Sequence, residues 1–193
     1  MGNFAGEFYL FVGLGQGKFE PKPSQLKTTN GSPMTVRHHS DPFLVDWDHD
    51  GDLDLVSGSS SGGVFLFTNV GDKKNPKFES AETLAMSMGS TGNSMKFGEA
   101  HITGPQQSTR VYVDDVNGDG KWDLLVGDNV SIHQPAEGLS PKAALEKHAA
   151  FVKDRDALMK AGSGKIDWGK LQEREAKIIK TERTGFVWVY YQL

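Results

Sequence analysis

Two short runs of the chain concentrate acidic side chains at a spacing that suits a hard cation. Loop 1 (residues 46–54) reads DWDHDGDLD, and loop 2 (residues 115–123), 69 residues later, reads DVNGDGKWD. Both follow the pattern DxDxDGxxD with Asn allowed at position 3, so side-chain oxygens recur at positions 1, 3, 5 and 9. Calcium takes 6 to 8 oxygen ligands, and a glycine at position 6 supplies the sharp bend that such a loop needs. The two loops therefore predict two calcium sites.

The predicted ligands are the carboxylates and the amide at those four positions, together with a backbone carbonyl at position 7. They are Asp46, Asp48, Asp50 and Asp54 with Asp52 in loop 1, and Asp115, Asn117, Asp119 and Asp123 with Lys121 in loop 2. The alternative is a polar turn in which Asp caps backbone amides, which explains one Asp-Gly pair better than several clustered like charges. An EF-hand is excluded because Ser57 and Val126 stand where its bidentate Glu would be.

Strands must position these loops. Short, apolar, aromatic-rich runs open with small residues at 6–11, 62–67 and 184–189, and residues 39–45 lead into loop 1. Each run predicts a strand, and the first two continue through a turn into a further short strand. The repeating unit is thus several strands without a helix, which favours the blades of a β-propeller.

Residues 131–183 interrupt this pattern and predict an inserted α-helical hairpin. Ser140 and Pro141 form an N-cap and a first-turn proline, and Gly162 is a C-cap. Asp167 is expected to cap a second helix. The predicted apolar positions are Leu145, Ala149, Val152 and Met159 on the first helix and Leu171, Ile178 and Ile179 on the second.

Residues 46–58 and 115–127 closely resemble the FG-GAP/VCBS repeat, the calcium-loop blade of integrin-α-type propellers and many bacterial secreted proteins. The resemblance covers roughly residues 6–130 and 184–193. It implies an all-β fold of propeller blades, a structural calcium ion in each loop, and adhesion or ligand binding rather than catalysis.

The part outside the insertion suffices for about three blades of ~45 residues, whereas a closed propeller needs about four to eight. We therefore expect residues 1–193 to form a single β-propeller segment, a partial ring. The rest of a larger propeller, or further copies in a homo-oligomer, would complete the ring, and the sequence leaves both open.

Composition narrows the classes of function. The chain has 193 residues and no cysteine, which excludes disulfides, zinc thiolate sites and cysteine nucleophiles. A net charge of −4 argues against nucleic-acid binding. No stretch approaches the ~20 apolar residues of a membrane span, and the N-terminus lacks the pattern of a signal peptide. The resemblance implies a secreted, cell-surface or periplasmic protein.

The expected function is a noncatalytic calcium-binding module for extracellular binding or adhesion, with a protein or carbohydrate as the ligand. Residues 58–62 formally match the GxSxG elbow of hydrolases, but that elbow leads into a helix, and here a strand is predicted. No acid/base pair has the apolar shielding that raises a pKa. The alternative is an accessory part of a secreted polysaccharide-active or other hydrolytic enzyme.

Overall fold

The computed structural model describes residues 1–88, 95–160, 162 and 166–192. The chain divides into two compact units: residues 1–89, 103–130 and 185–193 form the first, and residues 90–102 and 131–184 form the second. The described residues are mostly β, and both of their α-helices lie in the second unit. This confirms the predicted all-β fold with an inserted helical segment. The arrangement of the sheets as propeller blades stays a prediction.

The elements follow one another along the chain with short strands first and the helices near the end. They are β1 (Tyr9–Leu10), β2 (Gly13–Gly15), β3 (Lys18–Phe19), β4 (Ser24–Gln25), β5 (Asp41–Val45), β6 (Asp54–Gly58), β7 (Val64–Phe67), β8 (Glu82–Ala85), a 3-10 helix (Glu99–His101), β9 (Gln107–Asp114), β10 (Asp123–Pro135), α1 (Pro141–Lys160), α2 (Trp168–Ala176), β11 (Ile179–Thr184) and β12 (Val187–Tyr190).

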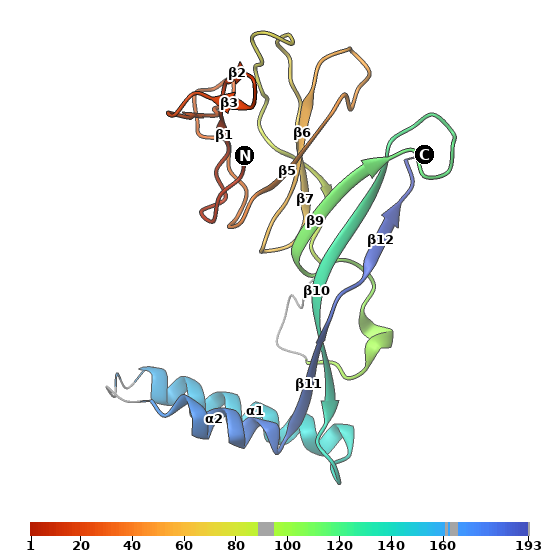
Figure 1. The fold of residues 1–193 in the computed structure, drawn as a ribbon. Helices are drawn as coiled ribbons and strands as arrows, with labels where there is room; N and C mark the ends of the chain where they lie inside the picture. Colours follow the sequence, from red (N-terminus) through yellow and green to blue (C-terminus); the bar gives the residue numbers. More distant parts are fainter. Residues whose placement is uncertain (89–94, 161, 163–165, 193) are drawn as a thin grey trace. The chain divides into compact units, whose positions relative to one another are not determined.

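Strands β5, β6, β7 and β8 form an antiparallel meander, which we call sheet A, in which each strand pairs with the next along the chain (Figure 1). All five residues of β6 are buried, because β6 has a strand on either side and packing on both faces. Strands β5, β6 and β7 follow the sequence-based expectation. The further short strand expected after the 62–67 run, near residues 76–79, begins later, at Glu82.

Sheet B repeats the first three strands of sheet A. Its strands β9, β10 and β12 are paired in the same antiparallel order, and β11 pairs with the far part of β10. The equivalent registers are Asp41↔Gly58 and Arg110↔Gly127, Val45↔Asp54 and Asp114↔Asp123, and Gly58↔Val64 and Gly127↔Val187. The insertion therefore lies where sheet A has only the short connection between β6 and β7.

Two apolar clusters hold the first unit together. One lies between the two sheets, and its buried members are Val45, Val56, Val64, Leu66, Ala85, Val111, Val113, Leu124 and Val126. The other lies between sheet A and the N-terminal segment, and its buried members are Phe8, Met34, Val36, Leu55, Phe67 and Phe78. Sheet A is thus covered on one face by sheet B and on part of the other by residues 1–36, which form only short strands.

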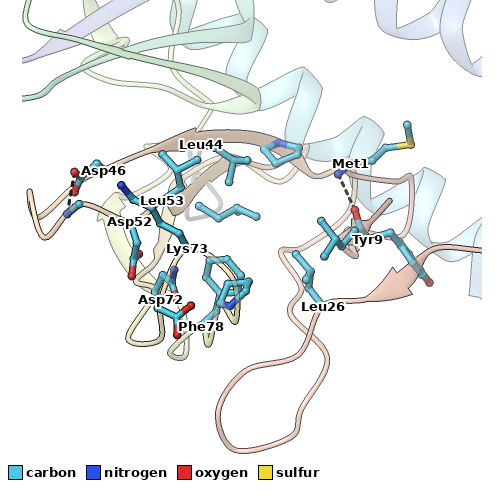
Figure 2. A pocket seen from close by; sticks show the side chains of 16 residues that line it. Met1, Tyr9, Leu26, Leu44, Asp46, Asp52, Leu53, Asp72, Lys73 and Phe78 are labelled. Atoms are coloured by element: carbon cyan, nitrogen blue, oxygen red, sulfur yellow. Dashed lines mark hydrogen bonds between the residues drawn. The ribbon is translucent and has the colours of Figure 1, made fainter. Parts of the chain in front are cut away.

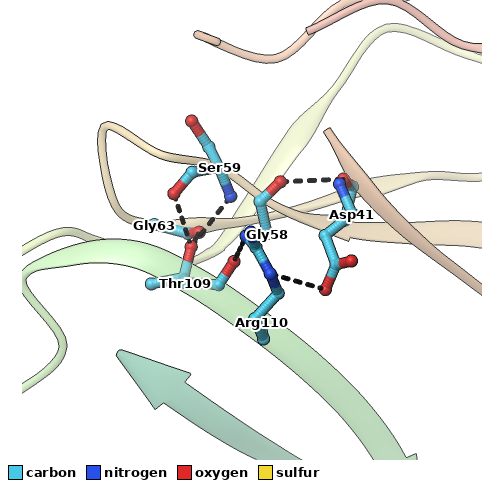
Figure 3. Close-up of polar contacts among 7 residues, drawn as sticks. Asp41, Gly58, Ser59, Gly63, Thr109 and Arg110 are labelled. Atoms are coloured by element: carbon cyan, nitrogen blue, oxygen red, sulfur yellow. Dashed lines mark hydrogen bonds and ion pairs between the residues drawn. The ribbon is translucent and has the colours of Figure 1, made fainter. Parts of the chain in front are cut away.

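The buried hydroxyl of Thr109 links the two sheets. The Thr109 hydroxyl accepts a hydrogen bond from the Ser59 N–H (2.8 Å) and lies 3.0 and 2.7 Å from the carbonyl oxygens of Ser59 and Gly63 (Figure 3). At the rim of this junction, Arg110 faces Asp41 at 3.8 Å. The residues that match GxSxG therefore form a turn that Thr109 holds, and strand β7 follows it.

We expect Thr109→Val to lower the free energy of unfolding by about 1–3 kcal/mol, because the Ser59 N–H and the facing carbonyls lose a buried partner. Denaturation with urea checks this. The matched control is Ser108→Ala beside it, which removes a hydroxyl from a less buried side chain and should cost less. Equal losses in the two variants would contradict the role assigned to Thr109.

In the second unit, α1 and α2 run side by side and confirm the predicted helical hairpin (Figure 1). The Ser140 side chain accepts from the Ala143 N–H at 3.3 Å, and the Asp167 side chain accepts from the Lys170 N–H at 3.1 Å, so both predicted N-caps are in place. An ion pair of 3.0 Å between Arg174 and Asp154 links the helices.

The predicted apolar faces of the helices were wrong in part. The buried residues of α1 are Ala144 and Phe151, whereas Leu145 and Met159 are exposed, because the face of α1 that meets α2 is one position off the predicted one. Helix α2 buries Leu171 as predicted but ends at Ala176. Ile178 therefore lies beyond the helix, and Ile179 is buried as the first residue of β11.

The N-terminal run at 6–11 was also predicted as a buried strand. Only Tyr9 and Leu10 form β1, because their partner β4 is equally short and Gly6 has a positive φ of 90°. Phe8 is nevertheless fully buried against sheet A.

Candidate metal centre

Loop 1 connects β5 to β6, and its backbone folds around its own carboxylates. The Gly51 N–H donates to Asp46 Oδ2 at 3.1 Å, the Asp50 N–H to Asp48 Oδ1 at 3.2 Å and the Asp52 N–H to Asp50 Oδ1 at 2.9 Å. Gly51 has a φ of 96°, which an L side chain rarely adopts. The glycine predicted to supply the bend therefore does so.

Three of the predicted ligands in loop 1 converge. One carboxylate oxygen from each of Asp46, Asp48 and Asp50 lies within 4.8 Å of the others. Two oxygens bound to one calcium ion at about 2.3–2.6 Å are at most about 5 Å apart, so this spacing fits a shared cation. Asp46 Oδ1 is buried and has no hydrogen-bond partner among the described residues. The group has the geometry and the negative charge of a calcium site.

Asp54, the predicted ligand at position 9, anchors the base of the loop. It is 1% exposed, and its two oxygens accept from the Trp47 N–H at 2.8 Å and the Asn69 N–H at 2.7 Å. Burial raises the pKa of Asp54, and the negative charges of Asp48 and Asp50 act in the same direction. A carboxylate oxygen can accept more than one bond, so Asp54 retains capacity for a metal.

Asp52 was predicted to offer only its backbone carbonyl, and its side chain was missed. The residue is 6% exposed, and Asp52 Oδ1 is buried without a hydrogen-bond partner among the described residues. Burial raises the pKa of Asp52, and the neighbouring charge of Asp50 raises it further. The pattern DxDxDGxxD gave no signal for this, since position 7 is not a side-chain ligand in such loops.

Loop 2 has the same residue pattern, and its side-chain oxygens accept hydrogen bonds from the loop's own backbone N–H groups. Asp115 accepts from the N–H groups of Gly118, Asp119 and Gly120 at 2.7–2.9 Å, and Asn117 Oδ1 accepts from the Asp119 N–H at 2.8 Å. Lys121 is exposed, and its N–H donates to Asp119 Oδ1 at 2.9 Å. Asn117 and Asp119 side chains are also joined at 3.3 Å, so these predicted ligands lie together.

Asp123 in loop 2 repeats the part that Asp54 plays in loop 1. It is fully buried and accepts from the N–H groups of Val116 at 3.0 Å and Gln192 at 3.1 Å. These donors occupy the positions of Trp47 and Asn69: one follows the first loop residue, and the other follows the third strand of the sheet. Both position-9 carboxylates thus tie the loop to the third strand.

The two loops touch. The Trp122 indole N–H donates to the Asp46 carbonyl at 2.7 Å, and the Trp122 ring stacks on His49 with centroids 5.5 Å apart. Trp47 packs against the apolar cluster between the sheets. Both tryptophans thus contribute to packing within the first unit.

A cavity of about 750 Å³ opens beside loop 1 within the first unit. Figure 2 shows Asp46 and Asp52 at one end and the apolar side chains of Leu44, Leu53 and Leu26 along its walls. This volume and largely apolar lining are typical of a surface that binds a partner or ligand.

Residues 46–126 match the family model described as an FG-GAP-like repeat. This stretch is therefore similar to FG-GAP-like repeats. The match begins at the first predicted ligand of loop 1 and includes the whole of loop 2, so the FG-GAP resemblance is confirmed. No curated protein and no solved structure matches the chain. Among the described residues, every helix is too short or too polar to span a membrane.

Proposed function

We propose that the FG-GAP-like region binds calcium in loops 1 and 2, and that the chain is a noncatalytic binding module that works outside the cytoplasm. The observation that carries the proposal is the convergence of one carboxylate oxygen from each of Asp46, Asp48 and Asp50 within 4.8 Å. In addition, Asp46 Oδ1 is buried without a hydrogen-bond partner among the described residues. Loop 2 offers side-chain oxygens at the same four positions of the pattern, with Asn117 in place of Asp48. The role of calcium is structural, because each loop joins two strands and is anchored by a buried carboxylate, Asp54 in loop 1 and Asp123 in loop 2.

The size of the effect follows from mass action. Extracellular calcium modules have Kd values of about 10⁻⁴ to 10⁻³ M, so 1 mM calcium adds about 0.4–1.4 kcal/mol for each site. Two sites together should raise the melting temperature of a chain of this size by about 2–10 °C. We expect this rise in calcium relative to EDTA, with magnesium giving much less.

Paired variants test the assignment to the loops. Asp50→Asn and Asp119→Asn each remove one ligand charge and should each abolish about half of the calcium-dependent rise. Glu82→Gln is the matched control, because Glu82 is an exposed carboxylate on β8 outside both loops. An unchanged calcium titration in both loop variants would overturn the proposal.

Acid should weaken the calcium effect. Calcium requires ionised carboxylates, and burial raises the pKa of both Asp52 and Asp54. Protons therefore compete with calcium at a higher pH than they would at free carboxyls. Titrations across a pH series should show the calcium-dependent rise shrinking as pH falls toward those raised values.

The ligand class of the module is a protein or a carbohydrate. A glycan panel and a panel of generic hydrolase substrates, both run on the calcium-loaded chain, separate the binding module from an accessory part of a hydrolytic enzyme. Binding without turnover is expected. Turnover that survives purification and disappears when calcium is removed would favour the enzyme.

A further inference from the structure

The packing of sheet A against sheet B defines two complementary faces. Sheet A contributes the face that carries Val56, Val64 and Leu66, which we call face 1. Sheet B contributes the opposite face of the repeat, face 2, and its residues are Val111, Val113, Leu124 and Val126. The two sheets share one register, so sheet B also has a face 1 and sheet A also has a face 2.

Face 1 of sheet B is open. The shared register places Leu125, Val187 and Val189 where sheet A has Val56, Val64 and Leu66. Val187 is 69% exposed and Val189 41%, whereas Val64 and Leu66 are 0% and 4% exposed. The same kind of aliphatic side chain that is buried in the middle of the unit is thus left in solvent at its end.

A pair of equivalent glycines independently indicates that face 1 of sheet B lacks a neighbouring sheet among the described residues. A Cβ at Gly58 on face 1 of sheet A would collide with the backbone carbonyl of Thr109, so the close approach of sheet B requires a glycine there. Gly127 is the equivalent residue of sheet B, and none of the described residues comes within 4 Å of the position that its Cβ would take. Gly127 would therefore allow another backbone to approach sheet B closely, and no backbone in the described part of the chain does so.

The other end of the unit carries the complementary half. Leu44 on face 2 of sheet A is 54% exposed, whereas Val113, its equivalent in sheet B, is 5% exposed. The N-terminal segment covers Leu55 but leaves Leu44 and Pro42 as walls of the cavity of about 750 Å³ (Figure 2). An open face 1 and a partly open face 2 therefore lie on opposite sides of the stacked sheets.

We propose that the chain associates head to tail with a second copy of itself, with the open face 1 of sheet B packed into the cavity beside Leu44 of the next copy. The occupant is a second copy because this chain exposes face 1 of sheet B and the Leu44 part of face 2 of sheet A, the two kinds of face that already pack together between sheets A and B. Pairing of two face 1 surfaces would leave the cavity empty. The contact is heterologous, so it propagates or closes into a ring. The inference goes beyond the proposed function, because it rests on register and exposure rather than on calcium.

Light scattering with size exclusion measures the mass in solution. The wild-type chain should be an oligomer that dissociates on dilution, and Val189→Glu and Leu44→Glu, one on each half, should both be monomers. Leu158→Glu is the matched control, because Leu158 is also 41% exposed but lies on α1. Circular dichroism and the calcium-dependent rise in melting temperature establish that each variant is folded. A wild-type chain that stays monomeric at its highest soluble concentration overturns the inference, and a retained calcium effect would leave the proposed function standing.

The absence of native cysteine permits a test of orientation. Val189→Cys and Leu44→Cys are prepared separately and treated with a flexible bismaleimide, alone and mixed. Head-to-tail packing predicts cross-linked dimers mainly in the mixture. Cross-linking of Val189→Cys with itself, or equal cross-linking with Leu158→Cys, would overturn the proposed arrangement.

Discussion

Replacing Asp54 by Ala is expected to lower the free energy of unfolding by about 3 kcal/mol, even in protein stripped of calcium. The substitution leaves the N–H groups of Trp47 and Asn69 without their acceptor, and the Asn69 bond is buried. Burial raises the pKa of Asp54, because an ionised carboxylate is costly to bury. The expected loss is therefore the net of the lost hydrogen bonds and the recovered desolvation.

Urea denaturation in EDTA isolates this structural role from any role in metal binding. Asp48→Ala is the matched control: Asp48 is exposed, belongs to the same loop and should cost less than about 1 kcal/mol without calcium. In calcium both variants should lose additional stability. Comparable losses for the two variants in EDTA would show that Asp54 does not anchor the loop.

Gly58→Ala is expected to cost about 3 kcal/mol, because the new methyl group meets the Thr109 carbonyl between the two sheets. Neither the backbone of β6 nor that of β9 can move without disturbing the apolar cluster between them, and overpacking of this kind commonly costs about 1–3 kcal/mol or more. Thermal and urea denaturation measure the loss.

Gly127→Ala is the matched control, since Gly127 holds the same place in sheet B and its Cβ would meet none of the described residues. In dilute protein it should change stability by less than about 0.5 kcal/mol. In concentrated protein it should weaken self-association. Equal destabilisation by the two substitutions in dilute protein would contradict the close approach assigned to Gly58.

The sequence was sufficient for the parts of the chain that depend on local rules. Loop 1 and loop 2 were predicted from their residue types, β7 and β12 from their apolar runs, and both helix N-caps from Ser140 and Asp167. Each of these features is set by the residues within a few positions of it, so reading along the chain recovers it.

Features set by distant partners could not be predicted in the same way. Ile179 belongs to β11 because β10 extends to Pro135 and offers it a partner, and the buried face of α1 is set by α2. The burial of the Asp52 side chain likewise depends on packing around loop 1 rather than on the loop pattern. The sequence therefore predicts which residues are candidate ligands, but it does not predict the burial that raises their pKa values.

The place of the helical hairpin in sheet B has a consequence for how such a chain can change. Strands β10 and β12 keep the register that β6 and β7 keep across a five-residue connection at 59–63, although the connection between them is many times longer. The free-energy cost of closing a loop grows only slowly with its length. The connection between β10 and β12 is therefore a permissive graft point, where segments can be exchanged, lengthened or lost while loops 1 and 2 and the sheets that carry them stay the same.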